Sequence, residues 1–253
     1  MKLVGMLMAY NELKTGNLLP CLDSLAEYCD DIVIYDDGSD DGSLEVYDDW
    51  NRNMWTPGCE LHVIHGERND FKNELAHKQQ QLELCKVIGA DWILRIDADE
   101  ILDWRGVQGI REMLEESDKP SYAFHTVNLW RSPCFYRLDN SYNDVVFNRL
   151  WRCTPDLHFD VKEGLHLTNY PVGATDNEGF APFEILHYGF ASDKAIIDKY
   201  EMYKAHGQSG WALNRLVDER TLRVAKSKQE WFQHPLPDDQ FSKVFSRSIV
   251  SQL

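Results

Sequence analysis

The sequence predicts an α/β fold in which a mostly parallel sheet is flanked by helices. Short apolar runs alternate with helical stretches through the first hundred residues. Continuous apolar runs are typical of strands that are covered on both faces. Strands that alternate with helices favour a parallel sheet, because each helix carries the chain back across the sheet to the start of the next strand.

The first hundred residues are expected to hold four strands and three helices. The strands are expected at residues 3–9, 32–35, 61–64 and 92–96. The helices are expected at residues 18–28, 43–50 and 71–88. Ser43 is a candidate N-cap of the second helix, and Gly89 fits the C-terminal cap of the third.

The pattern changes after about residue 104, where aromatic residues and prolines separate extended segments. Extended segments are expected at 122–129, 145–151, 157–161 and 184–188, and helices at 105–116, 191–206 and 212–226. Such a half adds mixed strands and loops that wall off a pocket. We therefore expect one domain over residues 1–228, with halves 1–103 and 104–228, followed by a loose or partner-docked tail at 229–253.

The composition is that of an ordinary globular chain, with 253 residues of which 43% are hydrophobic and 27% charged. The 42 acidic and 26 basic residues give a net charge of −16, so a long nucleic-acid duplex would be repelled. No apolar run approaches the roughly 20 residues of a membrane span, and the start lacks the cleavage site of a signal peptide. We expect a cytoplasmic protein with reduced thiols, because the six cysteines form no CxxC pair.

Polar side chains gather where three of the expected strands end. Ligands of open parallel sheets bind outside the carboxyl ends of the strands. The first, second and fourth strands are followed by Asn11, Glu12, Asp36, Asp37, Asp97 and Asp99. Carboxylates collected at one edge are unfavourable unless cations or hydrogen-bond donors compensate them. The simplest compensation is Mg²⁺ or Mn²⁺, held by one or two carboxylates together with substrate phosphates.

The Asp97-Ala98-Asp99 spacing favours this interpretation, because side chains two residues apart on an extended segment point the same way. A solvated acidic turn is the alternative. The turn around Asp37, Asp41 and Asp48 also resembles part of a calcium loop, but that loop needs a helix before it and a strand is expected there. The chain has neither GxGxxG after the first strand nor a P-loop, so phosphates would be met by metal and side chains.

These residues together resemble the family 2 glycosyltransferases of the GT-A fold. The matching stretches are LVGMLMAYNE, IVIYDDGSDDGS, NDFKNELAHKQQ and GADWILRIDADEIL, and they cover roughly residues 1–103. A weaker resemblance, in FDVKEGLHL and EILHYGFASDKAIIDKYEMYKAHG, is to the branch of bacterial lipopolysaccharide-core sugar transferases. The resemblance implies a GT-A-like, Rossmann-like sheet with a mixed acceptor-side half and C-terminal helices.

The resemblance also implies a metal-dependent, inverting transfer of a sugar from a nucleotide-diphosphate donor to a hydroxyl acceptor. The donor would be a UDP-sugar or, as a second choice, a GDP-sugar. The acceptor would be a glycan, a lipid-linked sugar or a small molecule, and the cofactor Mn²⁺ or Mg²⁺. The residues expected to contact the donor are Ala9, Asn11, Glu12, Asp36, Asp37, Lys72, Asp97, Ala98 and Asp99.

The resemblance places a late histidine in the metal shell, beside Asp97 and Asp99. His187 in LHYGF is the first choice and His166 the second. Glu163 in DVKEGLH matches the acidic position that related enzymes place before the acceptor site, and it is the expected general base. Asp160 is a poorer candidate for that role.

Other side chains have two interpretations each. Arg149, Arg152, Lys72 and Lys78 are candidates for phosphate or sugar contacts, or are solvated surface charges. Trp130, Trp151 and Trp211 are candidates for packing on sugar rings, or are core residues.

Three other functions compete with sugar transfer to an ordinary hydroxyl. A non-catalytic module that binds divalent cations would use the acidic turns without a nucleotide. A nucleotidyltransferase would need a Gly-rich basic segment near the first strand, where residues 11–14 lack one. A transferase that adds sugar to modified nucleic-acid bases is disfavoured by the net charge of −16.

Overall fold

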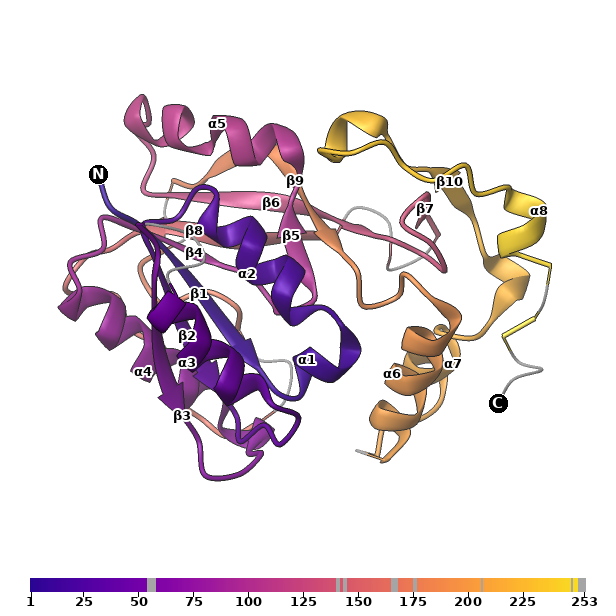
Figure 1. Cartoon of the computed structure of the whole chain (residues 1–253), viewed down its shortest axis with the longest axis horizontal. Coiled ribbons are helices and arrows are strands. Elements are labelled where there is room, and N and C mark those ends of the chain that lie inside the picture. The colour runs from indigo at the N-terminus through magenta and orange to yellow at the C-terminus, as the bar shows by residue number, and fades with distance from the viewer. Residues whose placement is uncertain are drawn as a thin grey trace.

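The computed structural model describes residues 1–53, 58–139, 142, 145–164, 168–174, 177–205, 207–246 and 248–249. Its core is an eight-stranded sheet with helices on both faces (Figure 1). The strands are β1 (Leu3–Ala9), β2 (Asp31–Asp36), β3 (Glu60–His65), β4 (Trp92–Arg95), β5 (Glu100–Leu102), β6 (Ser121–Asn128), β8 (Val145–Arg152) and β9 (Gly179–His187). Their order across the sheet is β3-β2-β1-β4-β8-β6-β9-β5. The α/β class predicted from the sequence is confirmed.

Helices α2, α4 and α5 bury apolar side chains on the two faces of this sheet. The helices of the described residues are α1 (Glu12–Thr15), α2 (Leu18–Ala26), α3 (Ser43–Asn53), α4 (Glu74–Val87), α5 (Trp104–Glu115), α6 (Asp193–Ala205), α7 (Trp211–Asn214) and α8 (Phe241–Val244). Leu22 of α2 and Ile110 of α5 belong to one core cluster, and Leu82 of α4 belongs to a second. Neighbouring residues of β1 alternate between the clusters, since Leu3 joins the first and Val4 the second. The continuous apolar run of β1 is therefore explained by burial on both faces.

The parallel part of the sheet brings three strand ends to one edge. β1 lies between β2 and β4 and runs parallel to both. Ala9, the last residue of β1, pairs with Asp36, the last residue of β2. Asp37 directly follows the end of β2, and Asp97 is the second residue after the end of β4. The polar residues that the sequence placed after these strands are therefore neighbours in space.

The second half of the sheet is mixed, as the sequence predicts. β8 pairs antiparallel with β4 and β6, β9 pairs parallel with β6, and β5 pairs antiparallel with β9. The pairing of β5 with β9 sets Glu100 opposite His187. A residue of the turn after β4 and the late histidine are in this way fixed to each other by backbone hydrogen bonds.

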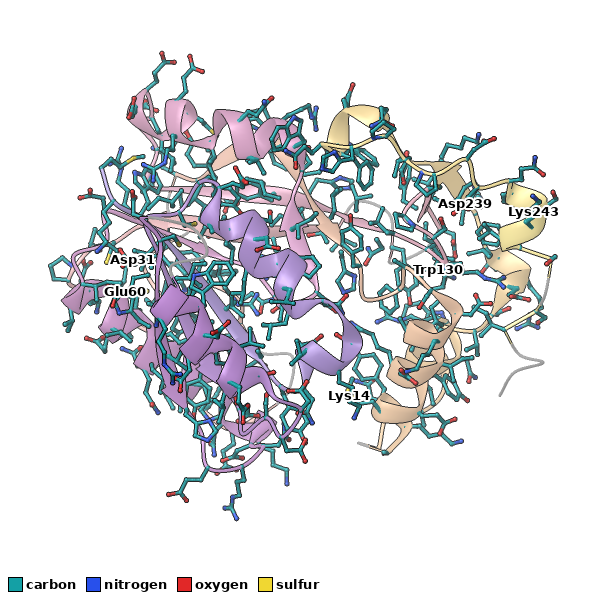
Figure 2. All side chains as sticks on the ribbon, viewed as in Figure 1. Lys14, Asp31, Glu60, Trp130, Asp239 and Lys243 are labelled. Carbon is teal, nitrogen blue, oxygen red and sulfur yellow. The ribbon has the colours of Figure 1, made fainter. Side chains whose placement is uncertain are left out.

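The C-terminal residues pack against the second half (Figures 1 and 2). A two-stranded sheet joins β7 (Phe135–Arg137) to β10 (Val224–Lys226). Trp231, in the 3-10 turn η4 (Gln229–Trp231), is buried beside the ends of β6 and β9. Ser132 donates to Asp239 at 2.5 Å, and Ile249 is buried in a cluster that also contains Trp130.

Residues 157–161 were predicted as an extended segment, and in the structure they belong to none of the strands. The N–H of Phe159 donates to Oε1 of Gln79 on α4, at 2.6 Å, instead of to a neighbouring strand. Within the described residues, the β-pairing of this segment consists of one isolated bridge between His158 and Val172. The alternation of buried Leu157 and Phe159 with exposed neighbours imitates a strand because these two side chains pack on α4.

The helix predicted at 212–226 is wrong beyond its first turn. α7 ends at Asn214, and the carboxylate of Asp218 accepts from the N–H of Arg220 to begin the 3-10 turn η3 (Glu219–Thr221). Residues 224–226 then pair with β7. Long-range pairing of this kind outweighs local helical preference, and the sequence does not reveal it.

Two further expectations concern cysteines and membranes. All six cysteines are free thiols, as predicted, and five of them are buried. Among the helices of the described residues, none has both the length and the apolar character needed to cross a bilayer.

Candidate active site

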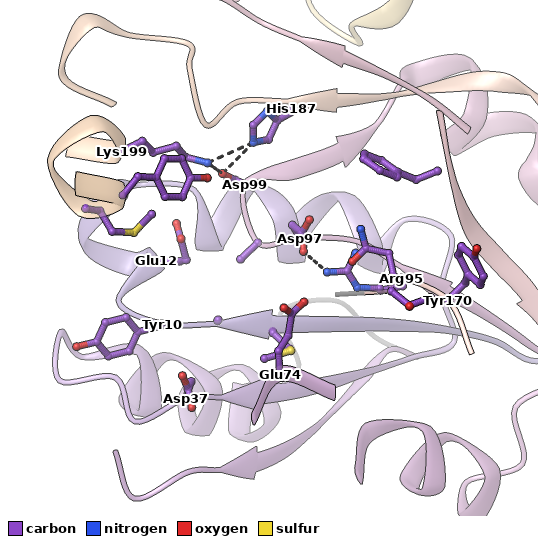
Figure 3. Close-up of a pocket in the computed structure, with 18 of the residues that line it drawn as sticks. Tyr10, Glu12, Asp37, Glu74, Arg95, Asp97, Asp99, Tyr170, His187 and Lys199 are labelled. Atoms are coloured by element: carbon purple, nitrogen blue, oxygen red, sulfur yellow. Dashed lines mark hydrogen bonds and ion pairs between the residues drawn. The ribbon is translucent and has the colours of Figure 1, made fainter. Parts of the chain in front are cut away.

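A cavity of about 700 Å³ opens at the carboxyl ends of β1, β2 and β4 (Figure 3). Its lining includes Ala9, Glu12, Asp37, Asp97, Ala98, Asp99 and His187, all of which were expected to contact donor or metal. Tyr10, Glu74, Arg95, Tyr170, Lys199 and Tyr203 line it as well. The size is that of an ordinary small-molecule site, which spans roughly 300–1,000 Å³.

Asp37 forms one end of the cavity, after β2. Its carboxylate accepts from the N–H of Asp70 at 2.9 Å and from Nδ2 of Asn69 at 3.0 Å. Burial raises the pKa of Asp37 to about 6, against the opposing effect of the Asp70 hydrogen bond. Asp37 is thus a carboxylate that is held in place, loses its proton near pH 6 and can accept hydrogen bonds above that pH.

Asp99, His187 and Lys199 form a cluster at the other side of the cavity. Oδ2 of Asp99 lies 2.7 Å from Nζ of Lys199 and 3.2 Å from Nε2 of His187. Lys199 and then His187 lower the pKa of Asp99 well below its usual range, overcoming the effect of burial. Figure 3 shows Lys199 reaching this cluster from α6, while Asp99 follows β4 and His187 ends β9.

Asp97 points to different partners. Its Oδ1 lies 2.5 Å from Nη2 of Arg95, and its Oδ2 lies 3.4 Å from the guanidinium of Arg149. The carboxylates of Asp97 and Asp99 thus have different partners in this structure. The expectation that both address one metal stays a prediction. The turn between them separates the side chains, because the N–H of Asp97 donates to Glu100 and the chain bends into β5.

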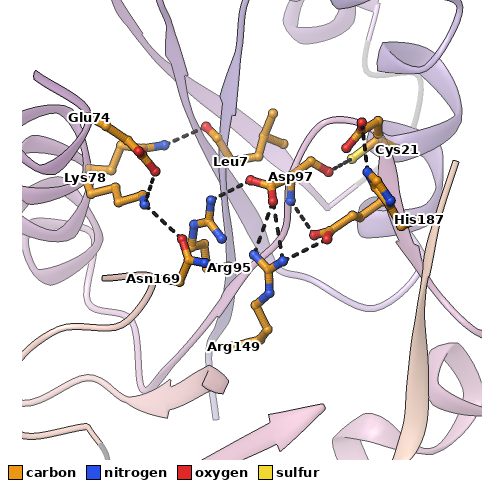
Figure 4. A network of polar contacts seen from close by, with 12 residues as sticks. Leu7, Cys21, Glu74, Lys78, Arg95, Asp97, Arg149, Asn169 and His187 are labelled. Carbon is orange, nitrogen blue, oxygen red and sulfur yellow. Dashed lines mark hydrogen bonds and ion pairs between the residues drawn. The ribbon is translucent and has the colours of Figure 1, made fainter. Parts of the chain in front are cut away.

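Paired acidic and basic side chains form a network beneath the cavity (Figure 4). Arg149 pairs with Glu100 at 2.7 Å, and Lys78 pairs with Glu74 on α4. Lys78 is fully buried, and burial lowers its pKa to about 8. Its ammonium also donates to Oδ1 of Asn169 at 3.2 Å.

The carboxylates of the site are thus compensated by the protein itself. The pairs are Asp97 with Arg95, Glu100 with Arg149, Asp99 with Lys199, and Glu74 with Lys78. These pairs are a second source of compensation beside the expected metal, which stays a prediction. The sequence argument counted the acidic residues of the turns and left out cations that come from distant strands and helices.

Residues 6–128 match the family model described as Glycosyl transferase family 2. This stretch of the chain is similar to the family 2 glycosyltransferases. The match contains β1, β2, β4 and the Asp97-Ala98-Asp99 turn, so the resemblance deduced from these stretches is confirmed. The similarity to lipopolysaccharide-core transferases stays a prediction.

A solved structure of S. aureus TarS shares the fold of this chain. The structure of TarS 1–349 aligns with a TM-score of 0.51 and 12% identity, over 85% of this chain and 69% of that chain. This confirms the GT-A-like fold. TarS 1–349 in complex with UDP-GlcNAc aligns with a TM-score of 0.42 and 19% identity, over 51% of this chain and only 35% of that chain. No curated protein matches the chain.

Asn11 and Asp36 were also expected to contact the donor, and that expectation stays a prediction. Asn11 has a left-handed backbone, with φ of 56°, and its Oδ1 accepts from the N–H of Asp40 at 2.9 Å. Asp36 is fully buried and accepts from the N–H of Ser39 at 2.7 Å and from Tyr47. Neither belongs to the cavity lining. Both tie the turn after β2 in place, which positions Asp37.

Lys72 and Glu163 lie outside the cavity lining. Both are exposed, and the two segments touch where the N–H of Gly164 donates to the carbonyl oxygen of Lys72 at 2.8 Å. Glu163 as base and Lys72 as a donor contact stay predictions. His166, the second choice as metal ligand, lies outside the described residues.

The arginines and tryptophans that had two interpretations differ in their surroundings. Arg149 belongs to the charged network, whereas Arg152 is exposed and donates to backbone carbonyls of Ser117 and Lys119. Trp130 and Trp151 are core residues, with 1% and 0% exposure, so they cannot face a sugar in this arrangement. Trp211 is exposed.

Three possible metal ligands lie close together elsewhere, in Asp31, Glu60 and His62. They sit at the amino ends of β2 and β3, at the opposite edge of the sheet from the cavity. Asp31 is already paired with Nζ of Lys2 at 2.6 Å and Nε2 of His62 at 2.8 Å.

Sequence reasoning assigned no role to Arg95, Glu74 or Lys199. A signal existed for Arg95, which interrupts the apolar run of a buried strand. Lys199 stands in the helical segment KYEMYK after LHYGF, but one lysine among several on an amphipathic helix carries no signal of its own. The role of Lys199 depends on its contact with Asp99, which lies 100 residues away in the sequence.

Proposed function

We propose that the chain transfers a sugar from a nucleotide-diphosphate donor to a hydroxyl acceptor in this cavity. One observation carries the proposal. In a chain similar to the family 2 glycosyltransferases, a carboxylate suited to a nucleobase and a cluster of charged side chains suited to phosphates line the same cavity of about 700 Å³. They lie on either side of the end of β1, as the two ends of a nucleoside diphosphate would require.

Asp37 is proposed to accept an N–H of the nucleobase, and Asp97 to Asp99 to face the ribose and diphosphate. Lys199 and Arg95 carry positive charge to the cavity wall, where the diphosphate would lie. A UDP-sugar is the first donor to test and a GDP-sugar the second, because the lining does not by itself choose between the bases.

Transfer is proposed to invert the anomeric centre. A carboxylate, with Glu163 as the candidate, takes the proton of the acceptor hydroxyl, whose oxygen forms a bond to the anomeric carbon. The bond from that carbon to the diphosphate oxygen breaks on the opposite face, and the nucleoside diphosphate leaves.

Asp99 and His187 are proposed to hold Mn²⁺ or Mg²⁺. Their ligand atoms, a carboxylate oxygen and an imidazole nitrogen, are 3.2 Å apart, a separation at which both can bind one ion. Such an ion supplies charge neutralisation to the leaving diphosphate. Asp97, the other carboxylate expected to bind the ion, is paired with Arg95 as Asp99 is with Lys199.

Nucleotide binding and turnover test the proposal. We expect UDP or GDP with MnCl₂ to raise the melting temperature, Asp37→Asn to weaken nucleotide binding, and Asp99→Asn to remove the metal-dependent part. Release of nucleoside diphosphate from a panel of sugar donors measures turnover. The proposal fails if no nucleotide binds, or if Asp37→Asn binds nucleotide as tightly as the unchanged protein. Cation binding without nucleotide binding would favour a cation-binding module instead.

A further inference from the structure

The Asp99–His187 contact brings two hydrogen-bond acceptors together. Nδ1 of His187 lies 2.9 Å from Oδ1 of Asn128, its partner across β6 and β9. The amide oxygen can only accept, so Nδ1 carries a proton, and in the neutral imidazole Nε2 then keeps a lone pair. That lone pair faces Oδ2 of Asp99 at 3.2 Å. Two acceptors at this distance repel each other unless a cation joins them.

Lys199 provides that cation. Its Nζ lies 2.7 Å from Oδ2 of Asp99 and 3.4 Å from Nε2 of His187. The ammonium also lies 5.0 Å from the ring centre of Phe190, and the same ring packs edge-on against the imidazole of His187 at 4.8 Å. The ammonium of Lys199 is therefore held in one position by Asp99, His187 and Phe190.

Gly189 leaves the room for this arrangement. A Cβ atom at position 189 would lie less than 3.0 Å from Nζ of Lys199, Oδ2 of Asp99 and Nε2 of His187. The three polar atoms therefore converge on one point beside the backbone of residue 189, which only a residue without a side chain leaves open.

We propose that Lys199 competes with a divalent cation for Asp99 and His187. The ammonium joins the two ligand atoms while the metal is absent, and it must swing away before a metal can bind both. An ammonium and a divalent ion cannot share these atoms, because two positive charges would then lie within about 3 Å of each other.

Lys199 is able to leave without a change of the backbone. It reaches the cluster from α6 on a flexible four-carbon stem, and 23% of its side chain is exposed to the cavity side. Once displaced, its charge remains at the cavity wall. This consequence rests on the proposed function: the freed ammonium would then face the donor diphosphate, so that metal entry and donor binding support each other.

The competition is tested by titrating the protein with Mn²⁺ in the absence of nucleotide. The signal of free Mn²⁺ in electron paramagnetic resonance gives both affinity and stoichiometry. All proteins carry His62→Ala, which removes one ligand of the Asp31–Glu60–His62 group and leaves one site to observe. We expect Lys199→Met to bind one Mn²⁺ about tenfold more tightly or better, since Asp99 and Glu12 lose a neighbouring positive charge.

Three variants serve as controls. Lys194→Met removes an exposed lysine of the same helix, paired with Asp198, and is expected to leave Mn²⁺ affinity unchanged. Lys199→Arg keeps the positive charge and is expected to keep the weak affinity. Asp99→Asn combined with Lys199→Met is expected to lose the tight site. Circular dichroism and thermal melting check that each variant is folded.

The proposal is overturned if folded Lys199→Met binds Mn²⁺ no more tightly than the parent, or if the gain persists when Asp99 is replaced. It is also overturned if Lys194→Met shows the same gain, which would indicate a general charge effect. None of these outcomes depends on turnover or on nucleotide. The failure of the proposed function, which is judged by nucleotide binding and donor cleavage, is therefore distinguished from a failure here.

Discussion

Arg149 donates to Glu100 across 2.7 Å, and only 2% and 4% of these side chains are exposed. The guanidinium also faces Oδ2 of Asp97 at 3.4 Å. A cation from β8 is thus fixed beneath the turn that joins β4 to β5. Asp97, Ala98 and Asp99 keep their positions at the cavity partly because this buried ion pair holds the turn from below.

The first prediction concerns Arg149→Met. The change keeps much of the side-chain volume but leaves Glu100 buried with an uncompensated charge. Breaking a buried pair from one side costs about 3–5 kcal/mol, so we expect the free energy of unfolding to fall by that amount in urea titrations.

The matched variant is Arg149→Met with Glu100→Gln. Removing both charges removes the uncompensated carboxylate, so we expect the double variant to be more stable than Arg149→Met alone. Equal stability of the two variants would contradict the electrostatic explanation and leave lost packing as the cause.

The second prediction concerns Gly189→Ala. The added methyl would lie less than 3.0 Å from Nζ of Lys199, and the flexible lysine is the group that can move most cheaply. We expect a crystal structure of the variant to show Lys199 turned away from Asp99, with the strand β9 in place. Gly109→Ala on α5 is the control, because it adds a methyl group to a crowded glycine away from the cavity. Gly207 is unsuitable, since its φ of 82° would strain the backbone of any alanine placed there. An unmoved Lys199 would contradict the packing argument.

The sequence predicted the parallel half of the fold well. Continuous apolar runs set β1, β2 and β4, and the register of these strands then brings Asp37, Asp97 and Asp99 to one edge. Local patterns are sufficient there, because consecutive elements of a strand–helix–strand rhythm are also neighbours in space.

The charge balance of the site could not be predicted in the same way. Arg149 comes from a strand that inserts antiparallel beside β4, and Lys199 from a helix that follows the sheet. Both reach the acidic turn through contacts of long sequence separation, which leave no periodic signal. The same reason explains the missed pairing of β10 with β7 and the wrong helix at 212–226.

The third prediction concerns the pH dependence of nucleotide binding. The pKa of Asp37 is raised to about 6 by burial, so the carboxylate becomes protonated as the pH falls through this value. A protonated acid accepts the base N–H poorly. We expect the affinity for UDP to fall several-fold between pH 7.5 and pH 5, as calorimetry can measure. Asp37→Asn should bind weakly and should lack the part of this pH dependence that belongs to Asp37.

The effect of Asp37 on stability has the opposite sign. Its folded-state pKa lies above its usual value of about 4, so the folded protein binds the extra proton between these values. The stability that Asp37 contributes is therefore full below about pH 4 and is lost as the pH rises through about 6. Asp37→Asn should stabilise the protein more at pH 7.5 than at pH 4 in urea titrations. An equal effect at both values would show that the pKa is not raised.

The fourth prediction concerns the proposed base, Glu163. It is exposed, and the cavity residues Asn169 and Tyr170 follow it six and seven positions later in the sequence. Because an exposed side chain supports little of the fold, Glu163→Gln should melt like the unchanged protein and bind nucleotide equally well. Loss of general-base help should lower transfer about a hundredfold or more. Asp160→Asn, an exposed carboxylate three residues earlier, is the control and should retain turnover. Normal turnover in Glu163→Gln would move the role to a carboxylate that lines the cavity, such as Glu12 or Glu74.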